Sequence, residues 1–307
     1  MLCVHSIHNI INKLGSQEVT EMKYSTLSAV TAALTEGTTP AETSSPTPTL
    51  TTISPAFYGA WLGFSDLVEL ESYDPIISEM SAILGEQVGL SADTIVRDEL
   101  VTYATIDYSG GQSAVGTLDS PAHDISYKDI VEQYAALEAA SALPADGEDF
   151  PVIIHPHTWA SLMQDPTFVN MFVQEAPNSA IRSGYVGRLL RMNFFVSSNA
   201  KEWADVGLGS TTDVYSALFI GRESYAILGL AGIDEPKDVD SQGDNGKVLT
   251  GQQIKPVEII MKSVGSSGAS DPLNQRGSLA WKMGLTPEVL NSDWIRVLKH
   301  TNAFSNS

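Results

Sequence analysis

The sequence predicts an α+β protein of extended shape, and three observations lead to this prediction. Residues 74–106 carry the apolar periodicity of one long helix, residues 34–66 have the composition of a two-stranded ribbon, and strand and helix patterns follow each other after residue 149. With 307 residues, 43% of them hydrophobic and 18% charged, the chain can bury a substantial core. An over-long helix and a poorly supported ribbon suit a flat subunit that contacts neighbours better than a protein that acts alone.

The long helix pattern begins with Asp74, a good N-cap residue, and with Pro75, whose missing N–H costs nothing at the first helical position. Apolar residues then recur at steps of three or four along one face. This face comprises Ile77, Met80, Leu84, Val88, Ala92, Ile95, Val96, Leu100 and Tyr103. Such a helix would be about 50 Å long. Gly85 and Gly89 weaken its middle by roughly 1 kcal/mol each, so they indicate a bend, a close backbone approach or a break into two helices.

The segments before this helix indicate an arm and a ribbon. Residues 1–33 contain short apolar pieces with weak periodicity, which is typical of an arm that lies on another surface. Residues 34–66 are rich in Thr, Ser and Pro, alternate around residues 50–53, and end with aromatic side chains at Phe57, Tyr58 and Trp61. This composition predicts a long two-stranded loop. Because an isolated ribbon is marginally stable in water, we expect it to rest on another molecule.

The rest of the chain indicates a central α/β module. Residues 107–124 form a polar turn region, residues 126–142 a second helix, and residues 145–149 a boundary. A buried strand at 152–155 and a short helix from Thr158 follow. Further strands are expected within residues 187–197, 213–230, 257–264 and 293–299, with a surface loop at 235–251.

The charge distribution excludes several classes of function. The net charge is −20, and residues 31–126 hold fourteen acidic residues against one basic residue, Arg97. Such a surface repels phosphate backbones, so sequence-specific nucleic-acid binding is not expected. No apolar run approaches the roughly 20 residues that cross a bilayer, so no membrane partner is expected. A single cysteine, Cys3, excludes a disulfide framework within the chain.

No catalytic, metal or cofactor site emerges from the residues. His155 and His157 could share a strand face, but Pro156 disrupts that geometry and no third ligand is signalled nearby. The nucleophile-elbow, P-loop and dinucleotide-binding motifs are absent from the sequence. Asp98 and Glu99 are neighbours on a helix and point in different directions. We therefore predict that the protein is not an enzyme and needs no cofactor.

Six stretches, in order along the chain, match the pattern of one family. They are LTEGTTPA (34–41), FYGAWLGFSD (57–66), ILGEQVG with DTIVRDEL (83–100), IHPHTWASLMQDPTF (154–168), GYVGRLLRMNFFVSSNA (184–200) and, most specifically, DPLNQRGSLAWKM with LNSDWIRVL (271–298). Together they resemble the major capsid proteins of tailed bacteriophages, in particular a podophage-type family. The family usually has a longer N-terminal region, so the arm is shortened or unusual here.

The resemblance implies the Hong Kong phage-type capsid fold. Its expected segments are an N-terminal arm (1–33), an extended β-loop (34–66), a peripheral domain with the spine helix (67–148), an axial α/β domain (149–256) and a return to the peripheral sheet (257–307). In such shells the extended loop of one subunit lies over its neighbour. The expected inter-subunit contacts are therefore Glu36, Gly37, Thr38, Thr39, Pro40, Tyr58 and Trp61.

The resemblance also implies a function. The protein is expected to self-assemble, as hexamers and pentamers, into the icosahedral shell of a virion that encloses phage DNA, and to be assembled in the host cytoplasm. Portal, scaffolding and decoration proteins are possible partners. Some capsids of this fold cross-link through a loop lysine, but no lysine lies between Lys23 and Lys128, so a non-covalent shell is expected. Two alternatives stay open: a nanocompartment shell of the same fold with protein cargo, and a soluble α/β enzyme built around His155.

Overall fold

The computed structural model describes most of the chain. The described residues are 7–11, 19–24, 27, 29–31, 33, 36–39, 45–54, 56–71, 76–145, 148–175, 188–230, 257–264, 273 and 275–304. The surface loop expected at 235–251, the expected helix start at Asp74 and Pro75, and the expected contact residue Pro40 lie outside these residues.

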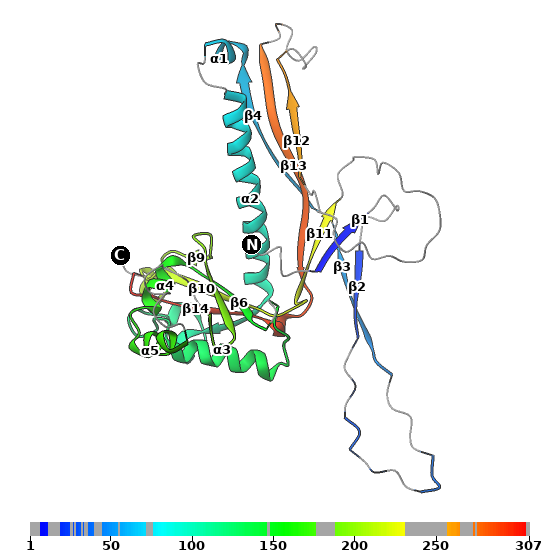
Figure 1. Ribbon diagram of the computed structural model, residues 1–307, viewed down its shortest axis with the longest axis vertical. Helices are drawn as coiled ribbons and strands as arrows, with labels where there is room; N and C mark the ends of the chain where they lie inside the picture. Colours follow the sequence, from blue (N-terminus) through cyan, green and yellow to red (C-terminus); the bar gives the residue numbers. More distant parts are fainter. Residues whose placement is uncertain are drawn as a thin grey trace.

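A five-stranded sheet is built around one long strand, β13 (Arg276–Val289), which runs through the upper half of Figure 1. The first half of β13 pairs antiparallel with β12 (Val257–Lys262) on one side and with β4 (Phe57–Ser65) on the other. Its second half pairs antiparallel with β11 (Tyr225–Leu230), which pairs in parallel with β1 (Ile7–Ile11). One strand thus joins two groups of partners into a long, narrow sheet.

Helix α2 (Ile76–Tyr103) runs along one face of this sheet, after the short helix α1 (Asp66–Glu71). Its buried side chains Leu84 and Val88 share an apolar core with Trp281 of β13. The expected long helix is confirmed, and because α2 is continuous the alternative of two separate helices is wrong. We refer to α2 with β4, β12 and β13 as the helix–sheet plate.

The two glycines of α2 lie on its exposed side, and nothing lies within 4 Å of a Cβ built at Gly85 or Gly89. The expected close approach of another backbone is therefore absent among the described residues of the subunit. Since glycine is the weaker helix former, Gly85→Ala and Gly89→Ala are each expected to stabilise the unassembled subunit by about 1 kcal/mol. Urea unfolding measures this, and a loss of stability in either variant would contradict it.

The helix ends earlier than expected. α2 stops at Tyr103, and β5 (Thr105–Tyr108) follows, paired in parallel with β14 (Ile295–His300). The β-branched residues Thr105 and Ile106, included in the expected helix, belong to this strand. Tyr103, expected on the apolar face, is 60% exposed, whereas Val101 and Ala104 beside it are buried, so Tyr103 lies on the outer side of the last turn.

A seven-stranded sheet forms the second part of the molecule, in the lower left of Figure 1. In spatial order its strands are β5 (Thr105–Tyr108), β14 (Ile295–His300), β10 (Val214–Ile220), β6 (Phe150–Ile154), β8 (Met192–Val196) and β7 (Arg188–Leu189), with β9 (Glu202–Trp203) paired to the start of β10. Short 3₁₀ turns occupy Ser109–Gly111, Val115–Thr117, Leu208–Ser210 and Ser292–Trp294.

Helices cover both faces of the seven-stranded sheet. On one face α3 (Tyr127–Ala139), α4 (Pro156–Leu162) and α5 (Pro166–Glu175) share a core with Phe219 of β10. On the other face Leu218 of β10 joins the core that contains the last turns of α2. Adjacent residues of one strand thus enter two different cores, as the period of two requires. We refer to this sheet with α3, α4 and α5 as the seven-stranded module.

Local sequence signals set the starts of two helices of this module. Ser126 caps α3, and its hydroxyl exchanges hydrogen bonds with Asp129 in a capping box. His155 caps α4, with Pro156 at the first helical position, so this helix starts two residues before the expected Thr158.

The ribbon is present but has other strands than expected. Its strands are β2 (Val19–Tyr24) and β3 (Pro48–Ile53), which pair antiparallel and extend below the sheet in Figure 1. It therefore begins before residue 34, and residues 57–65 lie instead in β4 of the helix–sheet plate. The aromatic residues Phe57, Tyr58 and Trp61 indicate the later boundary, but they belong to β4, which pairs along β13, because aromatic residues favour strands in a sheet of any kind.

Strand pairing also differs from the expected segments in two other places. β11 falls within the expected axial segment 149–256, yet it pairs with β13 in the five-stranded sheet. β14 falls within the expected return 257–307, yet it lies between β5 and β10 in the seven-stranded sheet. The physical reason is that the alternation of apolar and polar residues determines which face of a strand is buried, but it does not determine which other strand pairs with it.

Candidate assembly surfaces

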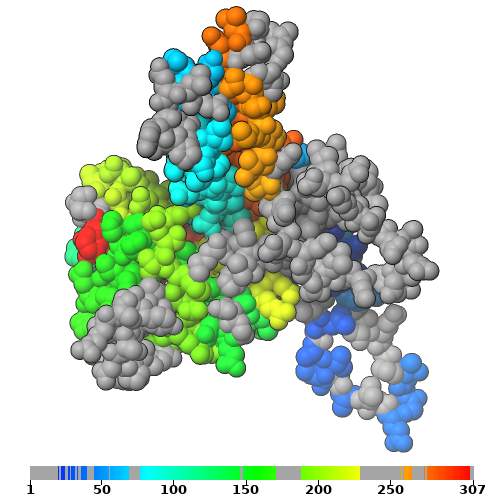
Figure 2. All heavy atoms as spheres, turned by 45° about the horizontal axis from the view of Figure 1, so that its top comes forward, coloured from blue at the N-terminus to red at the C-terminus, as the bar shows by residue number. Residues whose placement is uncertain are grey.

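The ribbon exposes apolar side chains that its own fold does not cover. Met22 and Tyr24 of β2 are each 61% exposed, and Leu50 of β3 is 59% exposed. Among its described residues the ribbon is anchored at the base, where Ile53 is buried against β11. Figure 2 shows the described residues of the ribbon, in blue, projecting away from the seven-stranded module in green. A ribbon with exposed apolar side chains is a surface that a partner would cover.

The described residues between the ribbon strands include four of the seven expected contact residues. Glu36, Gly37, Thr38 and Thr39 are exposed and lie in a turn. Gly37 has a φ of +78°, a left-handed conformation that suits glycine. The exposed Val30, in the same connection, adds an apolar side chain. These residues are accessible to a neighbouring molecule.

The two aromatic contact residues of β4 lie on opposite faces of the strand. Tyr58 is paired with Met283 on the face that packs against α2, whereas Trp61 is paired with Ala280 on the face away from α2. Trp61 is 70% exposed. Of the two, only Trp61 therefore stands on the open face of the sheet.

The open face of the sheet carries a pattern that the sequence interpretation missed. Aromatic residues alternate with glycine on this face of β4, in the order Phe57, Gly59, Trp61 and Gly63. Two exposed aromatic side chains are therefore flanked by residues that have no side chain. A Cβ at Gly59 would lie 2.7 Å from the carbonyl oxygen of Trp281, so β4 and β13 approach each other closely there. The signal that could have found this surface is the alternation of aromatic residues with glycine at period two.

Basic side chains gather on the same open face, although the chain is strongly acidic. The ammonium group of Lys282 lies 4.6 Å from the centroid of the Phe57 ring, within the range of a cation–π contact. Lys262 and Arg276 are exposed and share this face by strand register, as does Glu258. The face thus combines aromatic and basic groups, which fits contact with an acidic surface.

The two histidines considered as metal ligands have structural roles. The backbone N–H of His157 donates to Nδ1 of His155 at 3.2 Å, and Nδ1 of His157 lies 3.1 Å from the Tyr215 hydroxyl. Burial, and then the neighbouring His157, lower the pKa of His155, and Glu202 opposes this. Among the residues that the structure describes, no group of three or more possible ligands comes together to hold a metal ion.

A polar hollow beside β5 also has partners for its central cation. Arg296 forms an ion pair with Asp107 at 2.5 Å, and its Nε donates to the Gln133 side chain at 3.0 Å. Asp129 lines the same hollow and accepts hydrogen bonds from Ser126. These contacts satisfy the charged groups and tie β14 to α3.

None of the described helices combines the length and apolar character that a membrane span requires.

Comparison with known proteins identifies the family. A family model described as phage capsid protein matches residues 47–282, which is most of the chain. Comparison with curated protein sequences gives no significant match.

Solved capsid structures share the fold over nearly the full length. The capsid of Ralstonia phage GP4 superimposes with a TM-score of 0.66 at 13% identity, covering 99% of this chain and 89% of that chain. The capsid of cyanophage P-SCSP1u gives 0.65 at 12% identity, covering 97% and 88%. The capsid of cyanophage Pam1 gives 0.64 at 13% identity, covering 98% and 90%.

Family and fold agree with the surfaces described above. The expected mixed helix and sheet architecture of the phage capsid proteins is confirmed, and exposed apolar surfaces on the ribbon and the sheet suit a protein that contacts copies of itself. The chain therefore belongs to the phage capsid protein family, and it is a structural shell protein of the virion, not an enzyme.

Proposed function

We propose that copies of this chain form pentamers and hexamers that close into an icosahedral shell around packaged DNA. The observation that carries this proposal is the ribbon: it is anchored at Ile53 and leaves Met22, Tyr24 and Leu50 exposed. Head-to-tail contacts that close by rotation generate rings, and many weak contacts reused over a shell add up by multivalency.

In this proposal the parts of the subunit have separate roles. The first residues act as an arm, the ribbon and its tip act as the extended loop, the helix–sheet plate is the peripheral domain, and the seven-stranded module is the axial domain. The ribbon of one copy lies over its neighbour, with contacts from Glu36, Gly37, Thr38, Thr39 and Pro40. Trp61 contributes from the open face of the plate, and Tyr58 from its edge, where it is 37% exposed.

The charge of the chain supports a container for DNA that does not read its sequence. A net charge of −20 repels phosphate groups, so densely packed DNA would not adhere to the wall. Assembly takes place in the host cytoplasm, with portal, scaffolding and decoration proteins as the further partners.

Self-assembly is tested by size-exclusion chromatography and negative-stain electron microscopy of the purified protein. Wild-type protein is expected to form closed shells, capsomers or tubes. Tyr24→Ser and Trp61→Ser are expected to raise the concentration needed for assembly by about tenfold or more, because truncating an aromatic side chain at an interface costs about 2 kcal/mol.

Tyr103→Ser is the matched control for these variants, since Tyr103 is equally exposed at 60% and lies outside the proposed contacts. It is expected to assemble as the wild type does. Aromatic variants that also assemble normally would contradict the proposed contacts. A wild-type chain that stays monomeric even with a scaffolding protein would contradict the proposed function.

The shell is expected to be held together without covalent bonds between subunits. Lys23 lies on β2, and no lysine lies between it and Lys128, so the connection between the two ribbon strands has no amine to form an isopeptide bond. Purified particles boiled in detergent should therefore run on a gel as one band at 32.9 kDa. A ladder of multimers that persists under reducing conditions would contradict this expectation.

A further inference from the structure

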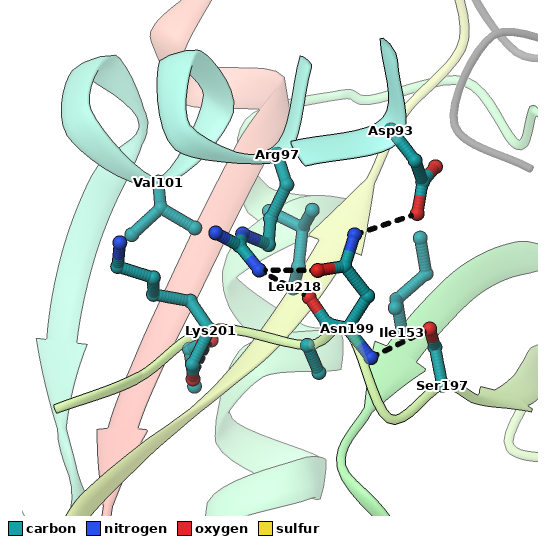
Figure 3. A pocket seen from close by; sticks show the side chains of 10 residues that line it. Asp93, Arg97, Val101, Ile153, Ser197, Asn199, Lys201 and Leu218 are labelled. Atoms are coloured by element: carbon teal, nitrogen blue, oxygen red, sulfur yellow. Dashed lines mark hydrogen bonds between the residues drawn. The ribbon is translucent and has the colours of Figure 1, made fainter. Parts of the chain in front are cut away.

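A polar clamp joins helix α2 to the loop between β8 and β9. Nη1 of Arg97 donates to the backbone oxygen of Asn199 at 2.6 Å and to its Oδ1 at 2.7 Å. Nδ2 of Asn199 donates in turn to Asp93, one turn earlier on the helix, at 3.2 Å. Figure 3 shows Arg97 and Asp93 reaching down from the helix to opposite sides of Asn199.

A second contact lies beside the first. Nζ of Lys201 lies 3.1 Å from Oδ1 of Asp98, and the same oxygen accepts from Nη2 of Arg97 at 2.8 Å. Burial alone would raise the pKa of Asp98, but the hydrogen bonds from Arg97 and Lys201 outweigh it and lower that pKa. The carboxylate is therefore held in its charged form by both cations.

The loop that carries Asn199 is fixed to the seven-stranded sheet. The Ser197 N–H donates to the Ile154 carbonyl of β6 at 3.0 Å. The N–H and hydroxyl of Ser216 in β10 both donate to the Lys201 carbonyl, at 3.0 and 2.8 Å. The loop is thus tied at both ends to the sheet, so a bond from α2 to Asn199 is a bond to the whole module.

The apolar contacts around the clamp do not define the orientation of the helix by themselves. Val101 of α2 packs near Ile153 and Leu218 of the sheet, and a cavity of about 20 Å³ lies among these side chains. Apolar contact is non-directional, whereas hydrogen bonds require a narrow range of angles. The clamp, together with the contact between Lys201 and Asp98, therefore supplies directional contacts at this junction.

Composition also singles out this position. Arg97 is the one basic residue among residues 31–126, and its side chain is only 15% exposed. An arginine that served only the solubility of this acidic region would be expected at the surface. Its five donors suit a residue that must hold several acceptors at once.

We propose that the clamp of Arg97 and Asn199 fixes the angle between the helix–sheet plate and the seven-stranded module, and thereby the curvature and size of the shell. This inference rests on the proposed self-assembly. In a shell each subunit repeats the same angle, so a small spread of angles within subunits becomes a wide spread of particle diameters.

The test uses an exchange of partners within the clamp. Asn199→Asp keeps an acceptor for Arg97, but it removes the donor to Asp93 and places two carboxylates face to face, so it should open the clamp on its Asp93 side. The double variant Asp93→Asn with Asn199→Asp puts an amide donor on the helix and a carboxylate on the loop, so it should close the clamp again. Arg222→Gln is the control, because Arg222 also pairs with the next residue in the chain, Glu223, but is 61% exposed.

Two measurements read the result. In unassembled subunits, hydrogen exchange of the Ala200 amide, which donates to the Ser197 carbonyl, should speed up about tenfold or more in Asn199→Asp. In electron micrographs, the fraction of particles in the wild-type diameter class should fall by about half or more, since misfit subunits are incorporated at many positions. The double variant and Arg222→Gln should match the wild type in both the exchange rate and the distribution of particle diameters.

The possible outcomes separate this inference from the proposed function. If Asn199→Asp leaves either the hydrogen exchange rate of the Ala200 amide or the distribution of particle diameters unchanged, the inference is overturned, even if wild-type shells form normally. A double variant as heterogeneous as the single variant would also overturn it. A wild type that forms no shell would count against the proposed function, while the exchange measurement on the free subunit would still test the clamp.

Discussion

Trp281→Ala is expected to lower the free energy of unfolding of the subunit by about 3–5 kcal/mol. Trp281 lies on β13, is 5% exposed, and packs in the core between α2 and the sheet. Its indole N–H also donates to the Gln87 side chain of α2 at 3.1 Å. The substitution removes the largest apolar group at this contact and leaves a cavity, so α2 would lose much of its hold on the sheet.

Trp61→Ala is the matched control, since Trp61 stands on the neighbouring strand β4, on the opposite face, and is 70% exposed. Its effect on the unassembled subunit should stay within about 1 kcal/mol, because exposed substitutions seldom cost more. Urea unfolding, followed by circular dichroism, compares the two variants. Equal losses would show that the helix–sheet core is not where the structure has it.

Acidification from pH 6.5 to about 4 is expected to cost about 3 kcal/mol of stability through His300 alone. His300 ends β14 and is fully buried. Burial lowers its pKa from 6.5 to about 4, against opposing effects of the Thr301 carbonyl and Asp129, while the nearby His155 lowers it further. The side chain also contacts the Thr158 hydroxyl at 3.5 Å and stacks near Tyr215.

The direction follows from proton binding in the two states. Between pH 6.5 and about 4 the unfolded chain takes up a proton on this imidazole and the folded chain does not. The unfolded state is therefore favoured as the pH falls through this window, and above pH 6.5 the effect vanishes. Burial raises the pKa of Glu99 and Glu288, which acts in the opposite direction, so a variant is needed to isolate His300.

His300→Gln provides this comparison. The difference in stability between wild type and variant should narrow by about 3 kcal/mol from pH 7 to pH 4, because glutamine does not titrate. His157→Gln, at an exposed position in the same cluster, should leave the wild-type dependence in place. Chemical denaturation at a series of pH values measures both. A wild-type profile that runs parallel to that of His300→Gln would contradict a buried neutral histidine.

Periodic patterns predicted the local elements of this fold well. The helix over residues 76–103 follows from the spacing of residues such as Leu84 and Val88, both of which are buried in the core. The buried strand expected at 152–155 and the short helix expected from Thr158 are also present, with bounds that differ by one or two residues. These patterns can be recognised within a few residues, because apolar residues recur with a different period in a helix than in a strand.

Long-range pairing could not be predicted in the same way. The alternation of Ile295, Val297 and Lys299 indicates a strand, but nothing in it selects β10 and β5 as partners. Composition likewise shows that Arg97 is the one basic residue among residues 31–126, but it gives no indication of the partner Asn199, which lies 102 residues away. The contact residues of the ribbon were expected from the resemblance to capsid proteins, and residues 36–39 are exposed as that role requires.

The position of β14 has a consequence for the order of events during translation. This strand comes after all the other strands of the seven-stranded sheet in chain order, yet it lies between β5 and β10, which are synthesised earlier. A nascent chain that has not reached Ile295 lacks that strand, and so does any product of premature termination before it. In both, β5 has no partner strand to join it to β10, so the helix that leads into β5 is held less firmly against the sheet until β14 is made.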